Sequence, residues 1–158
     1  MGLLAKLRTL QALEPGERGV LLQAVLLPAV VQFCFHTMGV SGTQAWLRTW
    51  ALRGKKTLSS EQKLLKLARR GTSLSTRLLR GDGTCLVRSM SIWALLLRRG
   101  IGTDLRVGFR KKDDRIEGHA WVEYRGLPVN EDPAVTGTYA VMPESAAYDL
   151  WATSRKDA

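Results

Sequence analysis

The chain has 158 residues, 45% of them hydrophobic and 24% charged, a composition that excludes an intrinsically disordered chain. Its length suits one domain with a real hydrophobic core. The formal net charge of +10 favours an acidic partner, such as an acidic peptide, a nucleic acid or an anionic membrane surface. The basic residues form short clusters without interleaved aromatic residues, so a solvated basic surface is the simplest explanation and nucleic acid is not expected.

The two cysteines, Cys34 and Cys85, have neither the spacing of metal ligands nor the number needed for a disulfide framework. No secretory signal peptide is visible in the sequence. We therefore expect a cytoplasmic protein with no metal and no cofactor, in which a reactive thiol stays reduced.

The first part of the chain is predicted to be helical. Residues 3–13 form a short amphipathic stretch, and residues 18 to about 38 form an apolar helix that Pro28 is expected to kink or break. The apolar run 20–35 is shorter than the ~20 residues needed to cross a bilayer and contains two glutamines. We expect a buried or groove-forming helix and no stable membrane span. Cys34 and His36 are expected to pack in the core, outside any site.

Two further helices are predicted before residue 81. Residues 43–53 carry Trp46, Leu47 and Trp50 at a spacing typical of a helix packed on a core. Ser59 or Ser60 is expected to cap the next helix, which runs to about residue 80. We expect a single domain over residues 1–158, with a helical subregion at 1–80 and a catalytic core at 81–145.

The pattern then changes from helices to a helix followed by strands. Apolar residues at three- to four-residue steps predict a helix over residues 85–99, and Gly100 follows as a left-handed cap. Alternation predicts strands at 105–109 and 118–124, separated by a charged turn at 111–117. A third strand is predicted over 127 to about 131, joined at Arg125-Gly126. A helix followed by an antiparallel sheet of at least three strands is an α+β fold.

Cys85 follows a glycine-rich loop, at the start of the predicted helix. A cysteine reacts as the thiolate, which the positive end of a helix dipole and a neighbouring imidazolium both favour. Gly81 and Gly83 let the backbone approach a substrate, the amide of Cys85 could stabilise an oxyanion, and Asp82 suits helix capping. Taken alone, Cys85 is better explained as a buried structural cysteine under a helix cap.

His119 adds a base on a neighbouring strand. If Arg125-Gly126 is a two-residue hairpin loop, His119 lies directly opposite Asp132 on the same face of the sheet. Glu131 would then point to the other face. A bulge or a three-residue loop would reverse the choice, because a slip of one residue exchanges the two faces.

The order Cys85, His119, Asp132 resembles the transglutaminase-like cysteine-hydrolase superfamily. In that superfamily the cysteine begins a helix, and the histidine and the acid lie on adjacent strands. The matching motifs here are His119-Ala120-Trp121 and Asp132-Pro133. The resemblance implies a transglutaminase- or papain-like core, in which the helix that bears the nucleophile packs on a small antiparallel sheet.

A narrower resemblance is to the leader peptidases of lasso-peptide biosynthesis, and it covers about residues 82–133. It rests on these motifs: Cys85-Leu86, Arg88-Ser89, Leu95-Leu96, Arg99-Gly100-Ile101, Val107-Gly108 and His119-Ala120-Trp121-Val122-Glu123. The resemblance implies that Cys85 attacks the scissile carbonyl, His119 shuttles the proton and Asp132 orients His119.

The same resemblance implies the partners. They are a precursor peptide that carries a leader and, because the first 80 residues leave no room for a recognition domain, a separate small leader-recognition protein. An ATP-dependent cyclase would act on the released core peptide. Two alternatives stay open: another thiol acyl-transfer enzyme, such as an amidase or a transglutaminase, and a peptide-binding module without catalytic activity.

Overall fold

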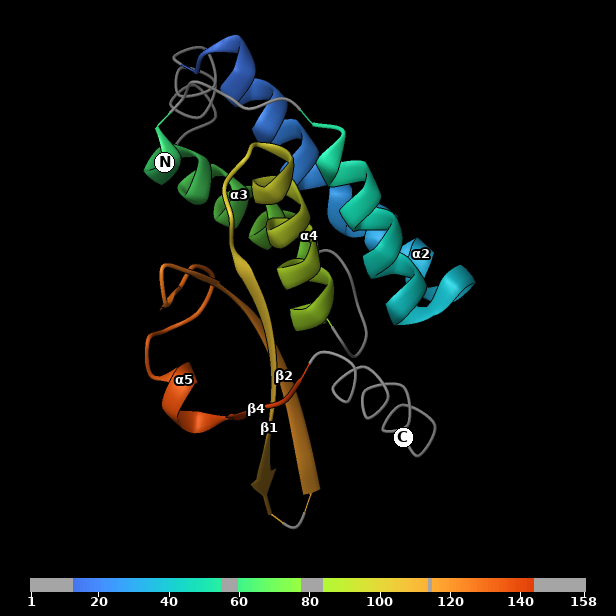
Figure 1. The fold of residues 1–158 in the computed structure, drawn as a ribbon, viewed down its shortest axis with the longest axis vertical. Helices are drawn as coiled ribbons and strands as arrows, with labels where there is room; N and C mark the ends of the chain where they lie inside the picture. The colour runs from blue at the N-terminus through green and yellow to red at the C-terminus, as the bar shows by residue number, and fades with distance from the viewer. Residues whose placement is uncertain (1–12, 55–59, 78–83, 114, 144–158) are drawn as a thin grey trace.

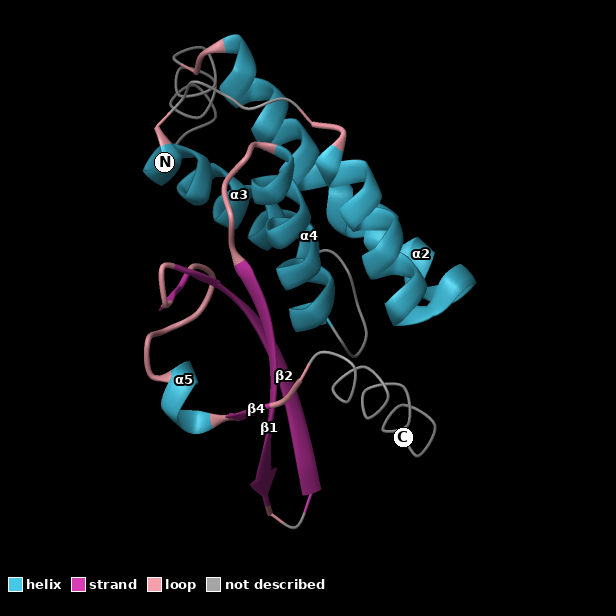
Figure 2. Ribbon diagram, viewed as in Figure 1, coloured by secondary structure: helices cyan, strands magenta, loops and turns pink. Residues whose placement is uncertain are grey.

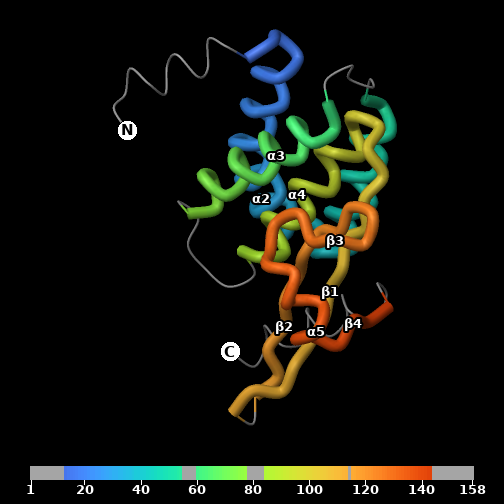
Figure 3. Tube along the Cα trace, turned by 90° about the vertical axis from the view of Figure 1, so that its left-hand side faces the viewer, coloured from blue at the N-terminus to red at the C-terminus, as the bar shows by residue number. Residues whose placement is uncertain are grey.

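The computed structural model describes residues 13–54, 60–77, 84–113 and 115–143. Its longer helices gather at one end, a long β-hairpin extends from them toward the other end, and a short helix lies beside the strands (Figure 1, Figure 2, Figure 3). The predicted stretch at 3–13 and the predicted roles of Gly81, Asp82 and Gly83 lie outside the described residues. In chain order the elements are α2 Pro15–Leu52, α3 Glu61–Thr76, α4 Thr84–Arg98, β1 Asp104–Lys112, β2 Arg115–Tyr124, β3 Leu127–Pro128, α5 Val135–Thr138 and β4 Ala140–Val141.

α2 joins the two helices predicted at 18–38 and 43–53, with a break between them. The break is at Gly39, whose φ of 70° and ψ of −178° lie in a region that glycine adopts readily and other residues do not. Pro28 does not break the helix, because it stays within α2 and the non-helical backbone lies at Gly39 instead. Its missing backbone donor is tolerated where the adjacent Leu27 and the nearby Val31 are buried in the core.

One face of α2 packs on the other helices and the opposite face is exposed. Gly71 of α3 lies against Ala24, where a Cβ on the glycine would come within 2.5 Å of the alanine Cβ, so the two helices cross closely. Four large apolar side chains form an exposed apolar stripe at three- to four-residue steps. They are Leu22 (61% exposed), Leu26 (56%), Val30 (42%) and Phe33 (68%).

By length and composition, α2 could cross a membrane, and it is the one helix in the described part of the chain that could. A third of its most apolar window is buried inside the protein, and a core helix passes the same test. Cys34 is buried on the packed face as expected, whereas His36 is exposed and its Nδ1 lies 2.7 Å from the carbonyl oxygen of Gln32. The expectation of core packing was therefore wrong for His36.

α3 and α4 complete the helical layer. Ser60 occupies the N-cap position of α3, where its carbonyl oxygen accepts hydrogen bonds from the amides of Lys63 and Leu64 and its side chain makes no capping hydrogen bond. α4 begins one residue before the predicted start, and Gly100 adopts a left-handed φ of 81° directly after it, as predicted. Apolar side chains of α4 such as Leu86, Met90 and Leu95 are fully buried between the other helices and the sheet.

The sheet has four antiparallel strands in the order β3-β2-β1-β4. The prediction of a charged turn over 111–117 is wrong, since β1 and β2 pair as far as Lys112 and Arg115. The prediction for Arg125-Gly126 is confirmed: both residues have positive φ, 52° and 77°, and Tyr124 pairs with Leu127. β3 stops at Pro128, so the strand predicted to run to 131 is too long. The α+β fold class is confirmed.

Candidate active site

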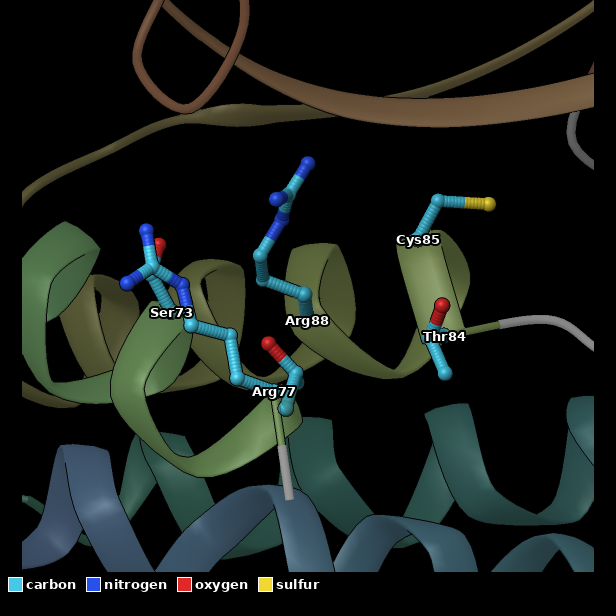
Figure 4. Close-up of a pocket in the computed structure, with 6 residues that line it drawn as sticks. Ser73, Arg77, Thr84, Cys85 and Arg88 are labelled. Carbon is cyan, nitrogen blue, oxygen red and sulfur yellow. The ribbon is translucent and has the colours of Figure 1, made fainter. Parts of the chain in front are cut away.

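Cys85 lies in the first turn of α4. Its side chain is half-buried and lines a pocket of about 280 Å³ together with Ser73, Thr76, Arg77, Thr84 and Arg88. In Figure 4 Ser73 and Arg77 project from α3, while Thr84, Cys85 and Arg88 project from α4. Backbone amides of a first helical turn have no partner within the helix, so they are available to a negatively charged group.

His119 lies on β2, and aromatic rings pack around its imidazole. The ring of Tyr139 stacks on it at a centroid distance of 5.1 Å, and that of Trp121 lies 6.4 Å away. Gly108 of β1 pairs with His119, and a Cβ there would come within 2.9 Å of the Tyr139 Cβ and 3.0 Å of the Trp121 ring. A glycine at this position therefore makes room for the rings that hold the imidazole.

The carboxylate beside His119 belongs to Glu131. Oε1 of Glu131 lies 3.5 Å from Nε2 of His119. The structure does not bring the Asp132 side chain to His119, because that carboxylate accepts a hydrogen bond of 2.9 Å from the amide of Ala134 in its own loop. The two-residue hairpin was predicted correctly, but the ladder ends before it reaches residue 131, so strand alternation no longer decides which acid faces the imidazole.

Asn130 determines how the chain leaves the sheet. The amide of Val122 donates to Oδ1 of Asn130 at 2.8 Å, in place of the backbone pairing that a longer strand would make. Nδ2 of Asn130 donates to Oγ of Ser89 on α4 at 3.0 Å, and that hydroxyl donates to the carbonyl of Ala120 at 2.8 Å. This buried network joins α4, β2 and the loop, and it presents Glu131 to His119.

Arg88, three residues after Cys85 and one turn further along α4, makes an ion pair with the carboxylate of Glu131. Burial alone would raise the pKa of the Glu131 carboxyl. Hydrogen bonding to His119 and the positive charges of Arg88, His119 and Arg69 outweigh burial and hold that pKa below its usual value. Glu131 is therefore ionised at neutral pH, as an acid that orients an imidazole must be.

The imidazole of His119 interacts with both the thiol and the acid. Hydrogen bonding to the Cys85 side chain contributes most to raising its pKa, hydrogen bonding to Glu131 adds to this, and both outweigh burial. The pKa of His119 rises to about 9. With Nε2 directed at Glu131, Nδ1 is the ring nitrogen left for the thiol. A charged imidazole next to a cysteine is the arrangement that makes the thiolate available at neutral pH.

The sequence interpretation did not assign four residues that surround this site. Arg88 entered only as part of a motif, and Arg77, Asn130 and Tyr139 were not singled out. Sequence spacing gives one hint: Arg88 follows Cys85 by three positions and so shares its helix face. Within the described residues, no group of three or more His, Cys, Asp or Glu side chains could hold a metal ion.

Comparison with known proteins agrees with this geometry. Residues 35–144 match the profile of the transglutaminase-like superfamily, and this range includes Cys85, His119 and Glu131. Because the match covers more than half of the chain, the protein belongs to the transglutaminase-like superfamily. Members typically have cysteine protease or transferase activity that uses Cys, His and Asp. No curated protein and no solved structure matches the chain.

Proposed function

We propose that this protein is a cysteine endopeptidase that removes the leader from a ribosomally made lasso-peptide precursor. One observation carries the catalytic part of the proposal: the His119 imidazole interacts with both the Cys85 thiol at the start of α4 and the Glu131 carboxylate. The choice of substrate is supported by the resemblance of residues 82–133 to leader peptidases. The reducing cytoplasm is the proposed compartment, since a reactive thiol persists there.

In the proposed reaction, the Cys85 thiolate attacks the scissile carbonyl carbon, and the carbonyl oxygen becomes an oxyanion. First-turn amides of α4, including that of Cys85, are placed to stabilise this charge. The His119 imidazolium donates its proton to the leaving amine, which departs as the new N-terminus of the core peptide. Water then gives a proton to the neutral His119 and attacks the thioester, which releases the leader with a carboxylate and restores the thiolate.

We propose Glu131, in place of the predicted Asp132, as the residue that orients His119. Its carboxylate is the one within reach of the imidazole, and Arg88 keeps it ionised. An acid in this role holds the ring in one tautomer and orientation and stabilises the imidazolium that forms during turnover.

We further propose that a small leader-recognition protein delivers the precursor, and that an ATP-dependent cyclase closes the released core. The exposed apolar stripe on α2 supports a protein partner, because contiguous exposed apolar side chains mark interaction sites. Phe33→Ser should weaken co-purification with the recognition protein. Ile116→Ser, which removes an apolar side chain that is 72% exposed on β2, is the matched control and should have no effect. Equal binding by both variants would show that the stripe is not the docking face.

The experiment that tests the function is mass spectrometry of a precursor peptide incubated with this protein and the recognition protein. We expect one backbone cut, at the junction of leader and core, that requires Cys85 and His119. A condensed or deamidated product would instead indicate another thiol acyl-transfer reaction. An intact precursor, despite proven formation of the complex, would favour a binding module without catalytic activity.

A further inference from the structure

The pocket beside Cys85 is lined by cations and hydroxyl groups. Arg77, at the end of α3, and Arg88, on α4, contribute the two guanidinium groups. Ser73, Thr76 and Thr84 contribute hydroxyl-bearing side chains. The volume of about 280 Å³ is enough for one amino-acid side chain. Such a lining suits a small polar or negatively charged group and disfavours an apolar one.

Among the residues that the structure describes, the positive charge around this pocket exceeds the negative charge. Arg69, Arg88 and His119 act on Glu131, the acid that lies among them. Arg77 adds a further positive charge, and no ion pair joins it to an acid in the part of the chain that the structure describes. The carboxylate of Glu131 already pairs with the side chains of Arg88 and His119, so it does not neutralise the charge of Arg77 as well.

The guanidinium of Arg88 has more hydrogen-bond donors than the acceptors around it satisfy. One terminal nitrogen pairs with Glu131, whereas its Nε is buried and has no hydrogen-bond partner. Buried polar atoms in folded proteins nearly always have a partner. Glu131 therefore does not satisfy every donor of the Arg88 guanidinium.

We propose that this pocket is a specificity subsite that binds a carboxylate of the substrate peptide next to the scissile bond, with Arg77 as its main recognition residue. The inference rests on the proposed function, because it assigns the pocket to the substrate of Cys85. Arg77 is exposed at the end of a helix, so its replacement leaves the core intact. Arg88 is the less suitable probe, since its loss would also release Glu131.

Two alkylating reagents test the subsite without any peptide. The Cys85 thiolate attacks the CH₂ carbon of either iodoacetate or iodoacetamide, which forms a C–S bond and releases iodide, so that a carboxymethyl or a carbamoylmethyl group is transferred. Only iodoacetate carries a carboxylate. We expect wild type to prefer iodoacetate relative to the preference of free cysteine. Arg77→Gln should lower the ratio of the two rate constants about two- to fivefold, the effect of one exposed charge contact. Added salt should lower it too.

Controls separate this contact from general charge. Arg115→Gln removes the same charge at the tip of the β1–β2 hairpin and should leave the ratio unchanged. Arg77→Lys keeps the charge and should restore most of the preference. An unchanged ratio in Arg77→Gln would overturn the subsite while leaving Cys85 as the nucleophile. Failure of Cys85 to react with either reagent would overturn the proposed function as well, so the two failures are distinguishable.

Two short peptides then identify the source of the carboxylate. One has a glutamate side chain and an amidated C-terminus, and the other has glutamine and a free C-terminus. Each is tested for slowing the reaction of Cys85 with iodoacetamide. We expect protection by the glutamate peptide, reduced in Arg77→Gln, since an endopeptidase binds internal residues. Protection only by the peptide with the free C-terminus would show that the pocket binds a terminal carboxylate and not an acidic side chain. Protection by neither would contradict the proposal.

Discussion

Glu131 contacts His119 from a loop whose side chains bond both β2 and α4. Its Oε1 lies 3.5 Å from Nε2 of the imidazole, and its carboxylate also pairs with Arg88 of the helix that bears the nucleophile. The preceding Asn130 is bonded to β2 and to α4. The acid and the imidazole are thus held by one connected set of contacts between the sheet and the helix that bears Cys85.

The first prediction separates the two adjacent acids. Glu131→Gln should reduce kcat/KM for precursor cleavage about 100-fold or more, because the imidazole loses both its orienting acid and the charge that stabilises its protonated form. Asp132→Asn, the matched control, should change kcat/KM less than about threefold, since that side chain bonds its own loop. Equal losses in the two variants, or a larger loss in Asp132→Asn, would contradict the assignment.

The second prediction concerns the acid limb of the pH profile. Arg88 helps to hold the pKa of the Glu131 carboxyl below its usual value, so Arg88→Gln should raise that pKa. The acid limb of kcat/KM should then move to higher pH, while activity at the optimum falls less than in Glu131→Gln. An acid limb that does not move would show that Arg88 does not act through Glu131.

The third prediction follows from the charge of His119. Its pKa rises to about 9, mainly through hydrogen bonding to Cys85, so NMR titration of its ring should show a midpoint near pH 9 in wild type. Cys85→Ala should lower the midpoint. A midpoint near 6.5 in wild type would contradict the pairing of imidazole and thiol.

The same shift predicts how stability depends on pH. The folded-state pKa lies above the unfolded value of about 6.5, so this stabilisation is fully present below pH 6.5 and is lost as pH rises toward 9. The free energy of unfolding, measured with urea, should decrease over that window in wild type. The decrease should be smaller in His119→Gln, and parallel curves for the two proteins would refute the linkage.

The fifth prediction concerns the buried network around Asn130. Asn130→Ala should lower the free energy of unfolding by about 1–3 kcal/mol, because it leaves the Val122 amide without an acceptor and removes the donor to the Ser89 oxygen. It should also reduce cleavage, since Glu131 loses its support. Thr136→Ala, which removes an exposed hydroxyl that bonds only Pro133, is the control for the loop. If Asn130→Ala unfolds no more easily than this control, the network is not stabilising.

The sequence predicted α4 and the Arg125-Gly126 turn well, because these depend on local periodicity and turn chemistry. Glu131 was ranked below Asp132 because alternation was extended past the end of β3. That end is set by the long-range bonds of Asn130 to Val122 and Ser89, which no local pattern contains. Arg77 is another long-range case, since only the packing of α3 beside α4 brings it to the pocket of Cys85.

The measurement that tests the central claim most directly is precursor cleavage in ¹⁸O-labelled water, with wild type and Cys85→Ala side by side and the recognition protein present. The account predicts that wild type releases a leader whose new carboxylate carries one oxygen from the solvent, and that Cys85→Ala releases none. A cut that persists in Cys85→Ala, or a precursor that stays intact in a proven complex, would contradict a thiol peptidase built on Cys85 and His119.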